Sequence, residues 1–541
     1  MYNAIYFLKY IDKAIMKSKQ IKKILLAVVV ATLSTNALAT EAELEDRIRK
    51  LEEMLKTLQQ QRTEQDKQVE ILTKELVGIE NQMTQKATKA EEDKKSTPVV
   101  TAGQEGFGFK SADGKNSIAL TGRVQAEYRT YGKSDAQNAD TTDLRRAYLT
   151  LSGKMFGDYD FKVSGDFAGQ LNDSGTTTAT TPSVTAVKAS KTILDEAYFG
   201  INWWKQAKLR FGQFQMPFGL ETTTSDLFND FTERSFVNAL TPFKERGGMV
   251  YGNPIDGIYY GLAISNGRGK NSNNTDTIND DSEVIGRGAV NLAKFFNSKD
   301  TVVHVGGSFS HGYISSNQAT NSTTLNSNSF LVGQGLAASQ TEGRGLTFFT
   351  PTGLFLPNGS DIERTRLGAE AAFAYGPLKI QTEYITHNYS GVGGTASGNA
   401  GTIAFDKNID AWYVSANWLL TGESYADGYL AESGTWGRIK PKNNLDFSNG
   451  KLGAIVLGLR YSDYDASDFK TGVGTTGSSP SGAHAWTAAI TWILNPNTRL
   501  AINYIDTKFE NGLYTYKDVS GNTLGTTNGE KALTLRGQFD F

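Results

Sequence analysis

Apolar and polar side chains alternate along the C-terminal residues of the chain. Between residues 531 and 541, one face of an extended strand would carry Leu533, Leu535, Gly537, Phe539 and Phe541. Successive strand side chains point to opposite faces, so this segment has one apolar and one polar side. The same period of two recurs from Gly106 onward. It predicts an all-β fold, a transmembrane antiparallel barrel whose last strand closes at Phe541.

Many alternating segments precede the last one, and long polar stretches separate them. The clearest segments are residues 121–128, 144–151, 161–167, 208–212, 364–373, 379–384, 412–420, 454–461, 486–494 and 499–506. Stretches rich in Gly, Ser, Thr and Asn cover residues 169–190, 266–281, 315–339, 390–402 and 465–482. Long outer loops that alternate with short periplasmic turns, such as 494–498, are typical of outer-membrane barrels. Residues 106–541 can hold about 16 strands.

Aromatic residues gather at the ends of these segments, as expected of the girdles at the two membrane interfaces. They are Trp203, Trp204, Tyr259, Tyr260, Trp412, Tyr413, Trp418 and Trp492.

Residues 40–90 follow a different, helical period. Steps of four and three residues reach Leu44, Ile48, Leu51, Leu55, Leu58, Arg62, Gln65, Val69, Leu72, Leu76, Ile79 and Met83. A strict heptad repeat predicts a coiled coil rather than a lone amphipathic helix. Arg62 and Gln65 at core positions either specify the oligomer or mark a frayed segment. Residues 91–105 show neither period and are expected to form a linker.

The first 39 residues resemble a secretory signal. Lys17, Lys19, Lys22 and Lys23 precede the apolar run 24–33, and Ala37-Leu38-Ala39 offers a small-x-small cleavage site. The run is about half the ~20 residues that a membrane-spanning helix needs. We therefore expect upstream residues, a start at Met16, a signal peptide that ends at Ala39 and a periplasmic coiled coil after it.

Composition narrows the function classes. The chain has 55 basic and 57 acidic residues, which gives no excess of charge for binding nucleic acid. The mean hydropathy of −0.38 excludes a helical membrane protein but suits a barrel, whose apolar residues alternate with polar ones. Cysteine is absent, so disulfides and thiolate chemistry are excluded.

An enzyme is not expected. The four histidines, His304, His311, His387 and His484, are far apart in the sequence, and no Gly-x-Ser-x-Gly motif is present. Barrel hydrolases need a nucleophile–histidine pair or metal ligands. We expect no catalytic residue, no metal site and no cofactor.

Several motifs, taken in order, resemble the phosphate-selective porin O and P family of Gram-negative outer membranes. They are residues 120–128 (LTGRVQAEY), 144–148 (LRRAY), 195–198 (DEAY), 209–221 (LRFGQFQMPFGLE), 232–235 (TERS), 421–423 (TGE), 440–441 (KP), 453–454 (GA), 460–462 (RYS) and 492–497 (WILNPN). The resemblance covers almost the whole barrel. It implies a homotrimer of 16-stranded barrels, each with its own pore, and inward loops whose basic residues select anions.

Candidate pore-lining residues come from the alternation along the strands and from the family resemblance. The period of two places on lumen faces Arg123, Arg146, Lys162, Lys208, Arg210, Arg364, Arg366, Lys379, Arg460, Arg499 and Arg536. The resemblance places Arg145, Arg146 and Arg234 near the constriction. Since Arg145 and Arg146 are adjacent, one of them must lie at a strand end or a bulge to face inward. We expect ion binding by Arg123, Arg145, Arg146, Lys162, Arg210, Arg234, Arg364 and Arg366, because guanidinium groups match oxyanions.

Acidic residues compete with these cations. Glu127, Asp160, Asp166, Glu383 and Asp540 share the lumen faces, and residues 106–541 hold 38 basic and 41 acidic residues after the 17 and 16 of residues 1–105 are subtracted. Any anion preference must therefore be local. Phosphate-specific family members carry lysine directly after the Phe-Gly-Leu-Glu motif, whereas this chain has Thr222.

These observations predict an outer-membrane porin with a water-filled, anion-preferring channel for phosphate or related oxyanions. The alternative is a general diffusion porin whose distinctive role is structural, with the coiled coil as a tether toward peptidoglycan; about 40 helical residues would reach about 60 Å. The expected partners are two further copies of the chain, membrane lipid and lipopolysaccharide, small anions, and the barrel-assembly machinery through Phe541.

Overall fold

The computed structural model describes most of the chain. The described residues are 41–103, 106–132, 140–168, 194–267, 269–271, 282–315, 339–349, 361–393, 403–472, 477–517 and 522–541. The signal peptide expected before residue 40 lies outside them, as do the polar stretch 169–190 and nearly all of the stretch 315–339. The chain divides into two compact units, Met1–Lys95 and Ser96–Phe541.

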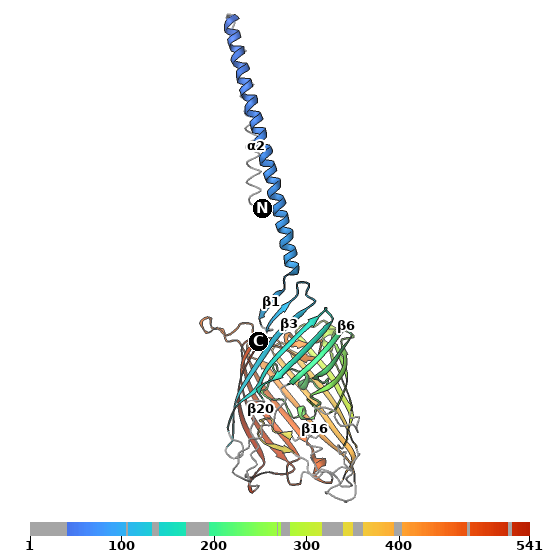
Figure 1. Cartoon of the computed structure of the whole chain (residues 1–541). Coiled ribbons are helices and arrows are strands. Elements are labelled where there is room, and N and C mark those ends of the chain that lie inside the picture. Colours follow the sequence, from blue (N-terminus) through green and yellow to red (C-terminus); the bar gives the residue numbers. More distant parts are fainter. Residues whose placement is uncertain are drawn as a thin grey trace, which may run out of the picture. The chain divides into compact units, whose positions relative to one another are not determined.

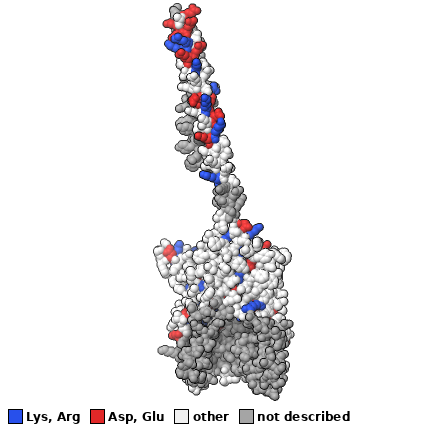
Figure 2. Space-filling view, viewed as in Figure 1, with Lys and Arg blue, Asp and Glu red and all other residues white. Residues whose placement is uncertain are grey.

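The first unit contains one long helix, α2 (Glu41–Ser96, 56 residues; Figure 1). Its heptad side chains are exposed; Leu55 and Leu72, for example, are 57% and 55% accessible. Basic and acidic side chains alternate along it (Figure 2). No described helix is both long enough and apolar enough to cross a membrane.

Helix α2 extends into residues 91–105, which the sequence pattern assigns to a linker. Residues 91–96 continue it, and strand β1 (Val99–Gly103) follows. Residues 91–95 are Glu, Asp and Lys, and Glu and Lys favour helix. Pro98 explains the end, because the residue before a proline is disfavoured in helical conformation.

The second unit is a closed barrel of sixteen described antiparallel strands, as the sequence pattern predicts. Each strand pairs with the next, and β24 pairs with β3 to close the sheet. The strands are β3 (Ser117–Tyr131), β4 (Thr141–Met155), β5 (Tyr159–Asp166), β6 (Leu194–Trp204), β7 (Ala207–Gln215), β8 (Lys244–Gly252), β9 (Ile258–Ser265), β10 (Glu283–Asn291), β11 (Thr301–Ser315), β14 (Asp361–Tyr375), β15 (Leu378–Gly393), β16 (Ile403–Leu419), β19 (Ala454–Asp465), β20 (Gly482–Asn495), β21 (Thr498–Glu510) and β24 (Gly529–Asp540).

Short elements complete the described fold. Strand β2 (Gly106–Lys110) pairs with both β1 and β3. The remaining pairs are β12 (Ser339–Gln340) with β13 (Thr347–Phe349), β17 (Tyr429–Leu430) with β18 (Thr435–Trp436), and β22 (Tyr514–Lys517) with β23 (Thr523–Thr527). The short helices are α4 (Leu220–Thr223), η1 (Phe236–Leu240), η2 (Leu292–Phe296), η3 (Tyr425–Gly428), η4 (Phe447–Asn449) and η5 (Ser467–Lys470).

Alternation along β24 matches the two faces of the wall. Leu535 and Phe539 are 40% and 51% exposed, whereas Arg536 and Gln538 are 6% and 5% exposed. The apolar set therefore faces outward and the polar set faces the interior. The Phe541 N–H donates to Gly122 O at 3.0 Å, which joins the C-terminus to β3 (Figure 1).

The adjacent pair Trp412 and Tyr413 splits between the two faces, whereas Trp203 and Trp204 at the end of β6 are both exposed. Trp412 is 37% exposed on the outer face, while Tyr413 is 1% exposed inside. Tyr259 is buried as well. Within a regular strand, neighbouring side chains point to opposite faces, and the buried Tyr259 and Tyr413 are not interfacial residues.

Two ends of the barrel can be distinguished. At the turn end, where β3 begins, connections such as 376–377 and 496–497 are short; the opposite end is the loop end. One turn-end connection departs from the expected short turns: residues 420–453, between β16 and β19, fold inward. Tyr425 and Trp436 are buried there, and Trp436 Nε1 donates to Gln381 Oε1 at 2.7 Å.

An apolar core fills part of the interior, which differs from a uniformly polar lumen. It joins inward strand residues to inserted connections; the ring centroids of Phe236 and Phe348 lie 5.8 Å apart, and those of Phe348 and Tyr464 lie 5.4 Å apart. Apolar burial therefore anchors the connections inside the barrel.

Candidate functional site

The connection between β7 and β8, residues 216–243, enters the barrel; we name it the constriction segment. Met216, Phe218 and Leu220 on it are fully buried. Gly219 turns the chain with φ of 70°, and a Cβ there would stand 3.0 Å from Glu383 Oε2. A larger residue would be strained at this position.

Glu383 of β15 holds the start of α4. Its carboxylate accepts hydrogen bonds from Leu220 N at 2.8 Å, Glu221 N at 2.6 Å and the Tyr413 hydroxyl at 2.8 Å. These bonds satisfy free N–H groups of the helix terminus. The backbone of the Phe-Gly-Leu-Glu motif thus anchors the constriction segment to the barrel wall.

Arg460 of β19 provides a second anchor. It donates to Glu221 Oε1 at 3.2 Å, to Glu233 O at 3.1 Å and to Glu342 Oε2 at 2.7 Å. Its side chain is almost completely buried. One guanidinium therefore ties the barrel wall to the constriction segment and to residues 339–349, using the fork geometry that lysine lacks.

A cavity of about 920 Å³ remains between the constriction segment and the wall formed by β3 to β6. Lys270 and Arg344 line it near the loop end, and Arg438, Asp540 and Phe541 line it near the turn end. The cavity thus extends along the barrel height, as a path for solutes requires.

Arg145 and Arg146 both face this cavity because of a β-bulge. Gln125 pairs with Arg146 and Ala126 pairs with Leu144, so Arg145 has no partner residue on β3. The extra residue restores an inward direction to two adjacent side chains. Asp195 and Glu196 on β6 line the cavity through a similar shift, since Ser164 pairs with Glu196 and Gly165 with Leu194.

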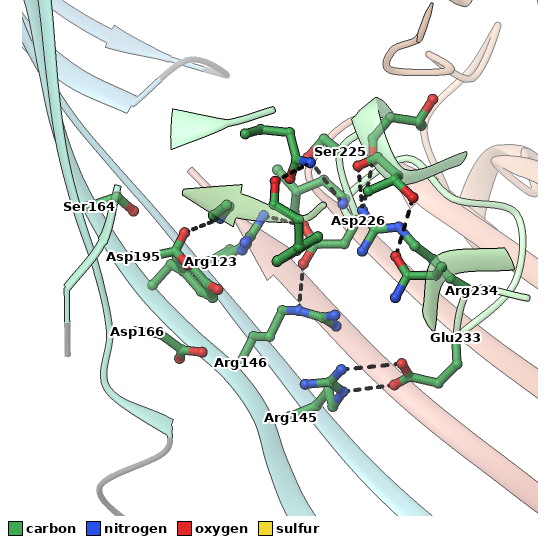
Figure 3. Close-up of a pocket in the computed structure, with 18 of the residues that line it drawn as sticks. Arg123, Arg145, Arg146, Ser164, Asp166, Asp195, Ser225, Asp226, Glu233 and Arg234 are labelled. Atoms are coloured by element: carbon green, nitrogen blue, oxygen red, sulfur yellow. Dashed lines mark hydrogen bonds and ion pairs between the residues drawn. The ribbon is translucent and has the colours of Figure 1, made fainter. Parts of the chain in front are cut away.

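Most arginines in the cavity are ion-paired (Figure 3). Arg123 and Arg146 each lie 2.5 Å from a carboxylate oxygen of Asp226. Arg145 binds both oxygens of Glu233, at 2.7 and 3.2 Å. Acidic residues of the constriction segment therefore neutralise basic residues of the wall.

Arg234 differs from these arginines. Its Nε donates to Glu221 O at 3.0 Å and its Nη2 donates to Thr224 O at 2.8 Å (Figure 3). It forms no ion pair with a carboxylate among the described residues. Backbone carbonyls fix the guanidinium without cancelling its charge.

The described side chains that line the cavity carry a small positive excess. Nine are basic: Arg123, Arg145, Arg146, Lys162, Arg234, Lys244, Lys270, Arg344 and Arg438. Seven are acidic: Asp166, Asp195, Glu196, Asp226, Glu233, Glu342 and Asp540. Charges that line a narrow aqueous path focus the potential along it.

Five of the eight expected site residues meet in this cavity: Arg123, Arg145, Arg146, Lys162 and Arg234. Lys162 is paired with Glu196 there. The other three lie elsewhere. Arg210 stacks on Tyr198 at 4.2 Å and Tyr251 at 4.7 Å.

Arg364 and Arg366 are buried beside Glu283, and each forms an ion pair with it. They are not among the residues that line the cavity, so their expected place on the solute path stays a prediction. A lumen-facing strand position gives the direction of a side chain but not whether a loop covers it.

Sequence reasoning missed several cavity residues. Asp226 and Glu233 lie in or beside the family motifs of residues 209–235. Acidic residues there could have been considered as ion-pair partners of the adjacent arginines Arg145 and Arg146. Lys270 and Arg344 lie in polar loop sequence, and neither alternation nor a motif marks them.

Comparisons with known proteins place this geometry among porins. A family model described as "Phosphate-selective porin O and P" matches residues 118–541. A curated relative, Porin O of Pseudomonas aeruginosa, is 24% identical over 426 residues, which cover 76% of this chain and 87% of that protein.

Solved structures with a similar arrangement include outer-membrane proteins of three organisms. OmpT of Vibrio cholerae has a TM-score of 0.43 at 10% identity, with 79% of this chain and 98% of OmpT covered. The channel DcaP of Acinetobacter baumannii has 0.41 at 11%, with 80% and 99% covered. OprB of Pseudomonas putida has 0.43 at 10%, with 79% and 95% covered. The barrel assignment itself rests on the strand pairing.

Proposed function

This chain belongs to the phosphate-selective porin O and P family, and on that premise we propose that it forms a water-filled, anion-preferring channel for phosphate or related oxyanions. The chain is a porin of the Gram-negative outer membrane, a channel and not an enzyme. The finer proposal concerns which ions the channel prefers.

The charge distribution of the cavity carries the proposal. Nine basic side chains face seven acidic ones, and Arg234 adds a charge that no described carboxylate pairs with directly. Inside a low-dielectric wall, such an excess raises the local concentration of anions. Arg123, Arg145 and Arg146 contribute less, because Asp226 and Glu233 offset them.

Thr222 limits selectivity for phosphate over other anions. It lines the cavity, and its hydroxyl donates to Thr241 Oγ1 at 3.2 Å. A lysine at this position, as in phosphate-specific family members, would add an ammonium point charge. We therefore propose a moderate phosphate affinity that one substitution can raise.

A phosphate titration tests this proposal. Chloride conductance of the purified protein in planar bilayers should fall as phosphate is added. The block should weaken in Arg146→Ala and Arg234→Ala, because each removes a cavity cation. It should strengthen several-fold in Thr222→Lys. If phosphate changes the current of neither the unmodified channel nor Thr222→Lys, oxyanion binding in this cavity is refuted.

We propose a homotrimer as the working assembly, with lipid and lipopolysaccharide around it and with Phe541 as the signal for barrel assembly. The exposed heptad face of α2 supports an oligomer, since the apolar a and d positions of a coiled coil need partner helices. One structure of OmpT is described as a trimer form.

A second candidate role is a tether toward peptidoglycan, favoured by the length of α2. Its 56 residues give a helix of about 84 Å. Deleting residues 41–90 should then abolish co-sedimentation with peptidoglycan while single-channel conductance stays unchanged. The double variant Leu55→Asp/Leu72→Asp keeps the length of α2 and disrupts only the association of α2 helices from different copies.

The two variants separate the roles of the coil. Loss of trimers in both would identify α2 as an assembly device. Unchanged attachment and unchanged assembly in the deletion variant would contradict both roles.

A further inference from the structure

Phe243, the last residue of the constriction segment, exposes its aromatic ring at the cavity. Its side chain is 38% exposed, and it lines the cavity near the loop end, where β8 begins one residue later. Three other phenylalanines of the segment are at most 7% exposed and pack inside the barrel: Phe218, Phe231 and Phe236. The ring of Phe243 is therefore available to a solute, whereas those three rings hold the segment in place.

The backbone of Phe243 is fixed, so the ring keeps its position in the cavity. Its carbonyl oxygen accepts hydrogen bonds from Met216 N at 3.0 Å and from Gln215 Nε2 at 2.6 Å. These bonds join the two ends of the constriction segment. A group that is already in place loses little conformational entropy when a ligand packs on it.

Two cations lie beside the ring. The centroid of the Phe243 ring is 5.6 Å from the guanidinium carbon of Arg234 and 5.4 Å from Lys244 Nζ. Lys244 is ion-paired with Asp195. Arg234 has no such partner among the described residues, and its hydrogen bonds to them come from Nε and Nη2 (Figure 3). Its Nη1 can therefore donate to an oxygen of a solute.

The combination of these two side chains matters more than either one. A single exposed phenyl ring is common on protein surfaces and needs no explanation. Here the ring lies on the wall of an aqueous cavity, beside a guanidinium that no described carboxylate neutralises. The cavity volume of about 920 Å³ is within the range of pockets that hold drug-sized molecules.

We propose that this part of the cavity binds organic oxyanions that carry an aromatic ring, such as aryl phosphates and aromatic carboxylates. The oxyanion pairs with Arg234, whose planar fork matches phosphate and carboxylate oxygens. The aromatic group packs on Phe243 in the offset or edge-to-face contact that aromatic pairs prefer. Inorganic phosphate makes only the first of these contacts. This inference rests on the proposed anion channel and adds a substrate class to it.

Block of the chloride current by three phosphate monoesters tests the inference. Methyl, cyclohexyl and phenyl phosphate carry the same charged group and differ in the size and aromatic character of the remainder. Each is titrated against the purified full-length protein in a planar bilayer, and the half-blocking concentration is read. We expect phenyl phosphate to block at a several-fold lower concentration than the other two, because it alone can form an aromatic pair with Phe243.

Variants of Phe243 show whether the ring causes the difference. Phe243→Ala should raise the half-blocking concentration of phenyl phosphate to that of cyclohexyl phosphate and leave that of methyl phosphate unchanged. Phe243→Tyr keeps an aromatic ring and should keep the preference. Phe211→Ala is the matched control, since Phe211 on β7 has a similar exposure of 40% but is not among the residues that line the cavity. Equal block by the three esters, or a phenyl preference that survives in Phe243→Ala, would overturn the proposed site.

Methyl phosphate and inorganic phosphate separate this inference from the proposed function. If both block the current and phenyl phosphate has no advantage, the oxyanion channel stands and the aromatic site is refuted. If none of the phosphates blocks the current, the proposed function fails and the aromatic site fails with it.

Discussion

Replacing Arg460 by alanine should give a wider and noisier pore, with a higher single-channel conductance than the unmodified protein. Arg460 binds Glu221 and Glu233 of the constriction segment and Glu342 of residues 339–349. Its loss leaves the carboxylates of Glu221 and Glu342 buried without this partner. Removing one partner of a buried ion pair typically costs about 3–5 kcal/mol. The strands keep their own hydrogen bonds, so the cost falls on the inserted segments.

Arg210→Ala is the matched control. It also removes an interior arginine, but Arg210 stacks on Tyr198 and Tyr251 and has no hydrogen bond to the constriction segment among the described contacts. Its conductance should stay close to that of the unmodified protein. An Arg460→Ala channel with unchanged conductance and noise would show that the constriction segment does not depend on this anchor.

Replacing Arg234 by glutamate should abolish the anion preference. The lining would change from nine basic and seven acidic side chains to eight of each. A balanced lining produces no net focusing of anions. Arg234 forms no ion pair with a described carboxylate, so no direct partner offsets its positive charge. Removing it therefore changes the net charge of the cavity lining directly.

Reversal potentials in a salt gradient report this change, and Arg234→Lys is its control. Lysine keeps the charge but loses the forked contacts to Glu221 O and Thr224 O. We expect Arg234→Lys to remain anion-preferring and Arg234→Glu to approach zero or reversed preference. Similar reversal potentials for both variants would mean that Arg234 does not govern selectivity.

The overall architecture could be predicted from the sequence because it depends on local periods. Alternation along 531–541 places Leu535 outside and Arg536 inside, and the closed sheet of sixteen strands is confirmed. The adjacency of Arg145 and Arg146 required an irregularity, and a bulge is found at Arg145. Both features follow from strand geometry alone.

The contents of the barrel could not be predicted in the same way. Residues 216–243, 339–349 and 420–453 reach the interior through contacts between distant segments, such as Arg460 with Glu342 or Trp436 with Gln381. The alternation of apolar and polar residues along one strand carries no information about such contacts. For that reason the ion pairs of Arg364 and Arg366 with Glu283 could not be predicted from their lumen-facing positions.

The reversal potential of the unmodified channel tests the central claim most directly. The purified full-length protein is placed in a planar bilayer between concentrated and dilute potassium chloride, and the voltage of zero current is read. A positive excess in the cavity predicts a sign that shows chloride passing more readily than potassium. A potential of zero, or one of the sign for potassium, would contradict the account.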